Sequence, residues 1–354
     1  MNWTETMGVR MGRVGIRELA AELGMSISTV SRAMNSRGEV SAATRERVRS
    51  AAERLGYQPN QSGRTLRRGA TGTVALVMQT NTARTEMGET FYFTVCNGLQ
   101  QELAKRSMDL VLLPVGPAKD PYRYLVNAVD RHIADAYVIS NTHRVDPRVE
   151  LLTERGVPFV ALGRGGPEGH AWLDLDFEGV AGQTVERLVA AGHTRIALAY
   201  DDGDVNSTWE YTRGYRQALT AHGLEPAAEI RLPDTPEGGG LLAERLLAMD
   251  PAPTAVMLAQ ETLALGLYKR FAETSVRPGE DLAVVGFRKN PVCDYLVPAL
   301  TTFEVSLEAY GRRLGEIVLA RVASPEAPVQ EVWPMTISPG TSDAAPPRAA
   351  ARLG

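Results

Sequence analysis

The segment from Ile16 to Asn35 holds two short helical patterns on either side of a glycine. The apolar residues of the first pattern share one face of a helix: Ile16, Leu19, Ala20 and Leu23. Gly24 follows, and glycine readily adopts the left-handed conformation in which many helices end. Ser26 then offers an N-cap for a second helix, whose apolar stripe is Val30, Ala33 and Met34. The segment therefore predicts two short helices around a tight turn.

The face opposite the second apolar stripe is polar. It presents Ser28, Ser31 and Arg32, with Ile27 at its edge. Short hydrogen-bonding side chains around an arginine suit a helix-turn-helix whose second helix reads base edges in a major groove. The helical period alone carries no function, so a helical hairpin without a DNA role is the alternative at this point.

Two further blocks follow this segment. The block VSAATRERV at 40–48 predicts a third helix, capped by Ser41 and ending at Gly56, with one apolar face made by Val48, Ala52 and Leu55. The order TVSRAMN, VSAATRERV and LGYQPN resembles the N-terminal domain of the lactose/galactose repressor (LacI/GalR) family. The resemblance continues to Ser342, through PTAVM at 253–257, DLAVVGF at 281–287 and LTT at 300–302.

The resemblance implies that the second helix binds the major groove of double-stranded operator DNA. The DNA-contacting residues it implies in and after this helix are Ile27, Ser28, Thr29, Ser31, Arg32 and Asn35. Within the family, the positions of Ile27 and Ser28 vary most with operator specificity.

Residues 60–71 match the family's hinge helix, which pairs with the hinge of a second subunit in the minor groove. The DNA contacts implied in this segment are Asn60, Arg64, Leu66 and Arg67. Leu66 is its only large apolar side chain and matches the leucine that wedges between base steps, while the arginines can neutralise phosphates. An isolated helix this short is marginal in water, so we expect DNA to order it. A flexible linker is the alternative interpretation.

Charge is distributed unevenly along the chain. The net charge is -4, yet residues 14–70 hold ten arginines and five glutamates. A basic N-terminal segment on an acidic remainder predicts a polyanionic partner for that segment alone, bound with salt-dependent affinity.

From Gly72 onward, continuous apolar segments alternate with helical patterns. The predicted strands are Thr73–Met78, Asp109–Leu113, Asp135–Ser140, Val157–Leu162, Arg195–Tyr200, Glu229–Leu232, Thr254–Leu258 and Asp281–Gly286. The predicted helices include Phe93–Arg106, Val180–Ala191, Tyr211–His222, Leu241–Met249 and Thr262–Glu273. This alternation predicts α/β architecture with parallel sheets covered on both faces.

The resemblance specifies the fold class further. It implies an all-α helix-turn-helix headpiece with a hinge helix, followed by a two-lobed α/β core like that of type I periplasmic binding proteins. The chain would cross between the lobes three times. The last helix, Leu307–Val322, would return to the first lobe, and the last strand, Gln330–Met335, would lie in the second.

These features divide the chain into five predicted parts. Residues 1–13 form an extension without structure, in which Met1, Met7 and Met11 are alternative starts. A DNA-binding domain at 14–59 and a hinge at 60–71 precede an effector-binding and dimerisation domain at 72–342. We expect its first lobe at about 72–163 plus 292–324 and its second at about 164–291 plus 325–342. The tail at 343–354 has no leucine heptads for a tetramerising coiled coil, so a disordered tail and a homodimer are expected.

Ligands of open parallel sheets bind outside the carboxyl ends of the strands, which here means the cleft between the lobes. The candidate effector-binding residues follow strands or begin helices: Asn81, Asn141, His143, Arg164, Trp209, Tyr211, Gln260, Glu261 and Arg288. Aromatic rings with amides and charged groups suit a sugar. Each polar residue could instead cap a helix or satisfy a loop.

The chain departs from sugar-binding members of the family at three places. Tyr211 stands where they commonly have an arginine, Gln260 and Glu261 stand where they have an Asn-Asp pair, and Arg288 replaces an acidic residue. A guanidinium favours a carboxylate or phosphate, so we expect a small carbohydrate, anionic ones included, with Arg288 facing it. Segments 141–149 and 171–176 also resemble the α-glucoside regulator branch of the family.

Several other classes of protein are disfavoured. No apolar run approaches the roughly 18 residues of a membrane span, and the first residues lack the apolar stretch of a secretion signal. Cys96 and Cys293 are far apart and predict buried thiols without a metal site, and no cofactor is expected. The glycine-rich segment 163–166 is followed by Pro167 and Glu168 and lacks the spacing of a phosphate loop, so an enzyme is not expected.

The sequence thus predicts a cytoplasmic, nucleoid-associated transcription factor. We expect a homodimer that represses carbohydrate-utilisation genes by binding a pseudo-palindromic operator under the control of a small-molecule effector. The alternative is a solute-binding module without a DNA role, which would require an export signal and no basic headpiece.

Overall fold

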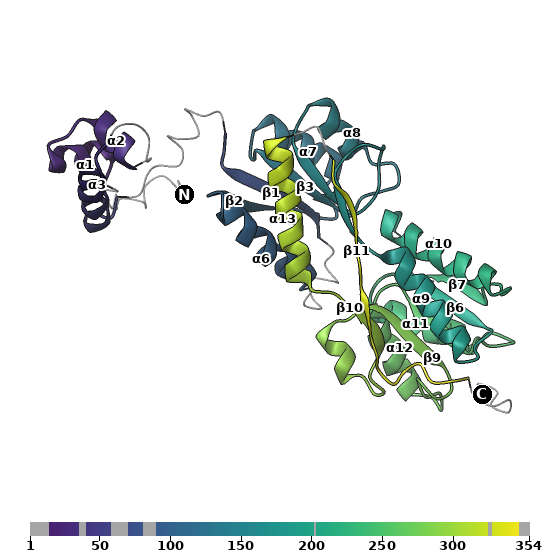
Figure 1. The fold of residues 1–354 in the computed structure, drawn as a ribbon. Coiled ribbons are helices and arrows are strands. Elements are labelled where there is room, and N and C mark those ends of the chain that lie inside the picture. The colour runs from purple at the N-terminus through teal and green to yellow at the C-terminus, as the bar shows by residue number, and fades with distance from the viewer. Residues whose placement is uncertain are drawn as a thin grey trace, which may run out of the picture. The chain divides into compact units, whose positions relative to one another are not determined.

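The computed structural model describes residues 14–34, 40–57, 70–80, 90–201, 203–324 and 328–346. The chain divides into two compact units, residues 1–71 and 72–354 (Figure 1).

The first unit contains three helices: α1 (Ile16–Leu23), α2 (Ile27–Met34) and α3 (Ala42–Arg54). Gly24 ends α1 in the left-handed conformation, with a φ of 63°. Ser26 Oγ accepts a hydrogen bond from the Thr29 backbone N at 3.1 Å, and Ser41 Oγ accepts one from Thr44 N at 3.2 Å. The predicted helices and their caps are therefore confirmed.

The predicted apolar stripes of these helices form one small core. Its buried members are Leu19, Ala20, Val30, Ala33, Val48, Ala51 and Ala52. Because every helix is too short to be stable alone, packing of these three faces holds the unit together.

The second unit contains two six-stranded sheets (Figure 1). The strands of the first sheet are β1 (Thr73–Gln79), β2 (Asp109–Val115), β3 (Ala136–Ser140), β4 (Phe159–Leu162), β5 (Trp172–Leu175) and β11 (Gln330–Trp333), in the order β11-β5-β4-β3-β1-β2. The strands of the second are β6 (Ile196–Tyr200), β7 (Ala228–Arg231), β8 (Ala255–Leu258), β9 (Ala283–Arg288), β10 (Thr301–Glu304) and β12 (Thr336–Ser338), in the order β12-β10-β9-β8-β6-β7. Every pairing between these strands is parallel except that of β10 with β12, as the apolar strands predicted.

Helices connect these strands. They are α6 (Phe91–Ala104), α7 (Pro121–Asp130), α8 (Pro147–Glu154), α9 (Phe177–Ala190), α10 (Asn206–Ala221), α11 (Pro236–Leu247), α12 (Thr262–Ala272) and α13 (Leu307–Ala323), with the 3-10 helix η1 at Pro291–Tyr295. We call the first sheet with its helices lobe 1 and the second sheet with its helices lobe 2.

The last helix, α13, packs against α6 of lobe 1, as expected (Figure 1). The approach is close because the two helices meet at glycines. A Cβ on Gly311 would lie 2.1 Å from the carbonyl oxygen of Val95, and a Cβ on Gly98 would lie 2.1 Å from the carbonyl oxygen of Glu308.

The expected placement of the last strand was wrong. Residues 330–333 form β11, which pairs in parallel with β5 in lobe 1, and only β12 lies in lobe 2. One extended segment thus serves both sheets, and Pro334 and Met335 lie between the two strands. The resemblance implied a single strand in the second lobe. Local apolar patterns identify an extended segment but not its pairing partner, so they could not correct that placement.

The expected lobe boundaries require correction for the same reason. Strand β5 belongs to lobe 1 although it follows residue 163, and β10 belongs to lobe 2 although it falls within 292–324. The chain crosses between the lobes after β5, after β10 and between β11 and β12, so the number of crossings was predicted correctly.

The first residues of the predicted tail are also held in place. Asp343 forms an ion pair with Arg187, and its Oδ1 accepts a hydrogen bond from Thr301 Oγ1 at 2.8 Å. The carbonyl oxygen of Ala344 lies 2.9 Å from His193 Nε2. The expectation of a tail without structure was therefore wrong for these two residues.

Cys96 and Cys293 are free and buried, as predicted, and burial raises the pKa of each thiol to about 11. Among the residues that the structure describes, no helix is both long enough and apolar enough to span a bilayer.

Candidate DNA-reading helix and ligand cavity

The outward face of α2 carries the polar side chains that the sequence singled out. Ile27 is 45% exposed and Ser28 and Arg32 are exposed, whereas Val30 on the opposite face is fully buried. The Ser28 and Thr29 hydroxyl oxygens each lie 2.8 Å from Ser26 Oγ. Arg32 Nε donates to the carbonyl oxygen of Ser28 at 3.3 Å. The N-terminal turn of α2 therefore presents a compact group of hydroxyls, and the last turn adds the Arg32 guanidinium, which reaches back to the Ser28 carbonyl oxygen.

Ser31 is half-buried on α2. The other predicted DNA-contacting residues, Asn35, Asn60, Arg64, Leu66 and Arg67, lie outside the described residues, as does most of the predicted hinge helix. Their contacts stay predictions.

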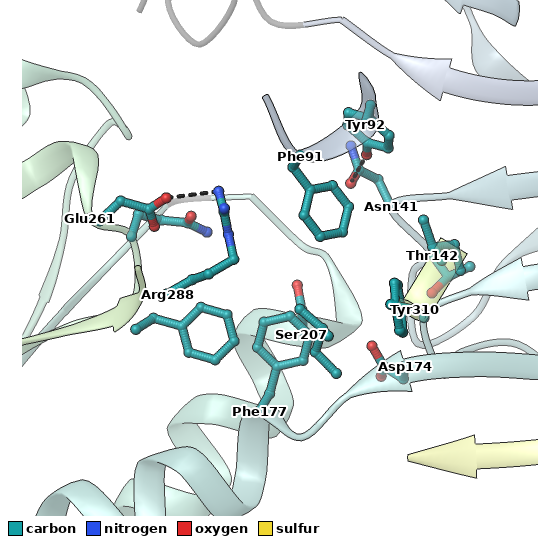
Figure 2. A pocket seen from close by; sticks show the side chains of 15 residues that line it. Phe91, Tyr92, Asn141, Thr142, Asp174, Phe177, Ser207, Glu261, Arg288 and Tyr310 are labelled. Atoms are coloured by element: carbon teal, nitrogen blue, oxygen red, sulfur yellow. Dashed lines mark hydrogen bonds and ion pairs between the residues drawn. The ribbon is translucent and has the colours of Figure 1, made fainter. Parts of the chain in front are cut away.

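A cavity lies at the carboxyl ends of strands from both lobes of the second unit, where ligands of parallel sheets bind (Figure 2). Its lining residues are Phe91, Tyr92, Asn141, Thr142, Leu162, Gly163, Asp174, Leu175, Phe177, Ser207, Gln260, Glu261, Phe287, Arg288 and Tyr310. The space not filled by atoms, its open mouth included, is about 770 Å³.

Asn141 follows β3 and has the left-handed backbone conformation, with a φ of 51°. Tyr92 donates from its hydroxyl to Asn141 Oδ1 at 3.2 Å, and Arg148 Nη2 donates to the Asn141 carbonyl oxygen at 3.0 Å. Arg148 is itself buried and pairs with Asp146 at 2.7 Å. Burial opposes ionisation of Asp146, but the hydrogen bonds and charge of Arg148 prevail and hold its pKa below the ordinary value. A buried ion pair thus fixes the backbone that presents the Asn141 amide.

Asp174, at the carboxyl end of β5, lies on the lobe 1 side of the cavity (Figure 2). Its Oδ2 accepts hydrogen bonds from the Arg164 backbone N at 3.0 Å and from Arg164 Nε at 3.3 Å. Burial raises the pKa of Asp174 to about 6, although the hydrogen bonds and charge of Arg164 oppose the rise. Arg164 Nη2 also lies 3.4 Å from Glu210 Oε2 on α10.

Arg288 and Glu261 face the cavity from lobe 2 (Figure 2). Arg288 is the last residue of β9, and Glu261 follows β8. Arg288 Nη2 donates to Glu261 Oε1 at 2.8 Å, and the two side chains are only 9% and 10% exposed. The Arg288 guanidinium carbon also lies 5.4 Å from the centroid of the Phe91 ring. The cation that the sequence expected to face an anionic ligand is therefore held by a carboxylate of its own lobe.

Aromatic rings form the apolar part of the cavity. Phe177 stacks on Phe287 with ring centroids 4.6 Å apart and planes 9° apart. Phe91 lies across the cavity from Phe177, and Tyr310 lies on the lobe 1 side near Asp174 (Figure 2). Rings on both sides with amides and hydroxyls between them suit a ligand that has an apolar face and a polar rim.

Four of the predicted effector-binding residues line this cavity: Asn141, Gln260, Glu261 and Arg288. Tyr211 does not, because it is 1% exposed and packs its ring edge behind Phe287, with centroids 5.5 Å apart. Arg164 lies behind Asp174 and is not among the lining residues. Asn81 lies outside the described residues.

His143 and Trp209 join the two lobes and do not line the cavity. His143 Nδ1 lies 2.5 Å from the carbonyl oxygen of Asp204. The Trp209 ring contacts two guanidinium groups, that of Arg144 at 4.5 Å and that of Arg213 at 4.4 Å. Since Arg144 belongs to lobe 1 and Trp209 to lobe 2, these contacts hold the lobes together.

Sequence reasoning missed most of the lining residues. The missed polar and aromatic residues are Phe91, Tyr92, Thr142, Asp174, Phe177, Ser207, Phe287 and Tyr310. Asp174 and Phe177 flank the end of β5, a strand that the apolar pattern did not identify, and recognition of β5 would have placed both at a strand end. Tyr310 comes from α13, and no local signal indicates that this helix returns to the site.

In the described part of the chain, no group of three or more histidine, cysteine, aspartate or glutamate residues could hold a metal ion.

Comparison with known proteins agrees with this architecture. Residues 15–60 match the model of the lacI family of bacterial regulatory proteins, and residues 185–342 match that of a periplasmic binding protein-like domain. The chain is 33% identical to the HTH-type transcriptional regulator CelR of Thermobifida fusca over 318 residues, 88% of this chain and 93% of that relative. It is 31% identical to the HTH-type transcriptional regulator RafR of Escherichia coli over 338 residues, 93% of this chain and 98% of that relative.

Solved structures show the same fold. A structure of the CelR–cellobiose complex is 30% identical, covers 93% of this chain and 100% of its own, and superposes with a TM-score of 0.71. The lac repressor dimer bound to operator and the anti-inducer ONPF is 21% identical and superposes with a TM-score of 0.84 over 94% of this chain and 100% of its own. The headpiece matches the family model, the core has two lobes, and relatives at this identity match over nearly their whole length. The chain therefore belongs to the LacI family of DNA-binding transcriptional regulators.

Proposed function

We propose that this regulator represses genes of carbohydrate utilisation by binding a pseudo-palindromic operator as a homodimer. The exposed Ser28 and Arg32 and the half-buried Thr29 of α2 support major-groove contacts by these three residues, with Ile27 and Ser28 setting operator preference. The arginines of residues 14–70 would add phosphate contacts. Binding to operator DNA implies that the protein acts in the cytoplasm, at the nucleoid.

The cavity between the lobes is the proposed effector site. The observation that carries this proposal is the pairing of aromatic walls with amide and carboxylate groups at the strand ends, an arrangement that stacks on one face of a sugar ring and hydrogen-bonds its hydroxyls. The structure of the relative CelR has been solved in complex with cellobiose. We propose that this chain also binds a carbohydrate. A ligand that favours one arrangement of the lobes would change operator affinity through the hinge.

The second candidate function is that of a solute-binding module without a DNA role. The LacI-type headpiece at residues 15–60 disfavours this candidate. Catalysis is not proposed, because the relatives with matching headpiece and core are transcriptional regulators.

The test of this proposal is the selection of operators by the purified full-length protein from a pool of random DNA duplexes, in the absence and presence of cellobiose, maltose and melibiose. We expect an enriched pseudo-palindrome, footprinted by a dimer, whose affinity changes at least about tenfold with one of the sugars, a change of about 1.4 kcal/mol in binding free energy. Arg32→Ala is expected to abolish enrichment while the sugar still binds, as measured by calorimetry. Failure to enrich any duplex at low salt would exclude the proposed function.

A further inference from the structure

The charges that face the cavity determine which carbohydrates it can accept. Among the residues that the structure describes, three side chains that carry charge at neutral pH line it: the carboxylates of Asp174 and Glu261 and the guanidinium of Arg288. The next charged groups behind them are Arg164, which contacts Asp174, and Glu210, which contacts Arg164. In this group of five, carboxylates outnumber guanidinium groups.

Arg288 forms an ion pair with Glu261, which also lines the cavity. Glu261 lies 2.8 Å from its Nη2, and both side chains are about nine-tenths buried, so the pair is weakly screened by solvent. A ligand carboxylate or phosphate that approached Arg288 would also approach Glu261. It would have to displace that carboxylate from a buried ion pair or lie beside it, and both are unfavourable.

An uncharged sugar is not repelled by the Glu261 carboxylate. Its hydroxyls can donate to carboxylates and accept from a guanidinium at the same time, so a paired Arg288 and Glu261 offer both kinds of group without a change in net charge. Phe177, whose ring stacks on that of Phe287, lies on the same side of the cavity as Arg288 and offers an apolar surface to the face of a sugar ring (Figure 2).

We propose that the Arg288–Glu261 pair is a specificity determinant that makes the cavity select an uncharged pyranoside and reject sugar acids and sugar phosphates. This inference rests on the proposed carbohydrate effector, and it replaces the expectation that Arg288 attracts an anionic ligand. A protonated amino sugar is the competing ligand, because the carboxylates are in excess. The pairing of each lining carboxylate with an arginine favours the uncharged ligand over the amino sugar.

The test is isothermal titration calorimetry of the full-length protein with cellobiose, maltose and melibiose, each compared with the uronic acid that differs only by a carboxylate at C6 of the non-reducing ring. For the best neutral disaccharide, the uronic acid is expected to bind at least about tenfold more weakly. The corresponding disaccharide of glucosamine is expected to bind no more tightly than the neutral sugar.

Variants then test whether the pair sets this selectivity. Glu261→Gln leaves Arg288 without its carboxylate and is expected to reduce discrimination against the uronic acid by about tenfold. The double variant Glu261→Gln with Arg288→Gln restores the original charge balance and is expected to restore discrimination, even if it weakens binding of both ligands. Glu273→Gln, at the other end of α12 and away from the cavity, is the matched control and should leave the ratio unchanged.

The outcomes separate this inference from the proposed function. Tighter binding of a uronic acid or an amino sugar than of every neutral disaccharide would overturn the selectivity and leave a carbohydrate effector in place. An unchanged ratio in Glu261→Gln, with the fold confirmed by circular dichroism, would remove the pair as the determinant. Absence of binding by every sugar tested would reject the carbohydrate effector itself, and this inference with it.

Discussion

Among single residues, Asp174 is a buried carboxylic acid whose pKa is shifted far from its ordinary value. It is 3% exposed and contacts Arg164 through the backbone as well as the side chain. Burial raises its pKa to about 6 in the folded protein, against an ordinary value of 3.8. The folded state therefore holds this proton at a higher pH than the unfolded chain does.

The raised pKa of Asp174 makes the free energy of unfolding depend on pH. Asp174 contributes stability that is complete below its unfolded pKa of 3.8 and is lost as pH rises through about 6. Asp174→Asn cannot titrate, so the unfolding free energy of the wild type minus that of the variant is expected to fall between pH 4 and pH 7. Urea denaturation across this range, without sugar, measures the difference. A difference that stays constant across this range would refute the raised pKa of Asp174.

At the scale of elements, the contact between α6 and α13 depends on small residues. Gly98, Gly311 and Gly315 each face the other helix at a distance that leaves no room for a Cβ. This contact matters for the site because α6 supplies Phe91 and Tyr92 and α13 supplies Tyr310 to the same cavity.

Gly311→Ala is expected to destabilise the protein although alanine favours helices. The added Cβ would lie 2.1 Å from the Val95 carbonyl oxygen, a backbone atom that can move away only if the two helices separate. We expect a loss of about 1–3 kcal/mol in the free energy of unfolding, the usual cost of overpacking. Gly182→Ala is the control in α9, where a Cβ would meet no atom within 4 Å, and should gain up to about 1 kcal/mol. Equal effects of the two substitutions, measured by urea denaturation, would show that the glycines are not required by packing.

At the scale of the whole molecule, charge separates the two units. Residues 14–70 hold ten arginines and five glutamates, whereas the entire chain has a net charge of -4. Phosphate binding is therefore expected to be a property of the first unit, and ligand binding a property of the second.

Removal of residues 1–71 tests this division. The fragment 72–354 corresponds to the second compact unit, and we expect it to pass through a heparin column that retains the full-length protein until salt is raised. The fragment should keep its affinity for the sugar within about threefold, because every lining residue of the cavity lies within it. Retention of the fragment on heparin would show that the acidic unit also binds polyanions.

Some residues of the candidate site could be predicted from the sequence and others could not, for a physical reason. Polar residues directly after a recognisable apolar strand, such as Asn141, Gln260 and Arg288, could be predicted because parallel strands end at one edge of a sheet. The local pattern did not indicate that Tyr211 points into the core of its lobe, or that Phe177 and Tyr310 point into the cavity. The direction of a side chain depends on helix rotation and on packing partners that are distant in the chain.

The three headpiece helices, their caps, most strands of the core and the family could be predicted from the sequence, because each depends on spacing and motifs within a few dozen residues. The pairing of β5 with β11 in lobe 1, the helices that enclose the cavity and the ion pair of Glu261 with Arg288 became evident in the folded protein alone. Pairing between strands and between charges joins residues that are far apart in the chain, and no local pattern encodes which of the available partners will meet.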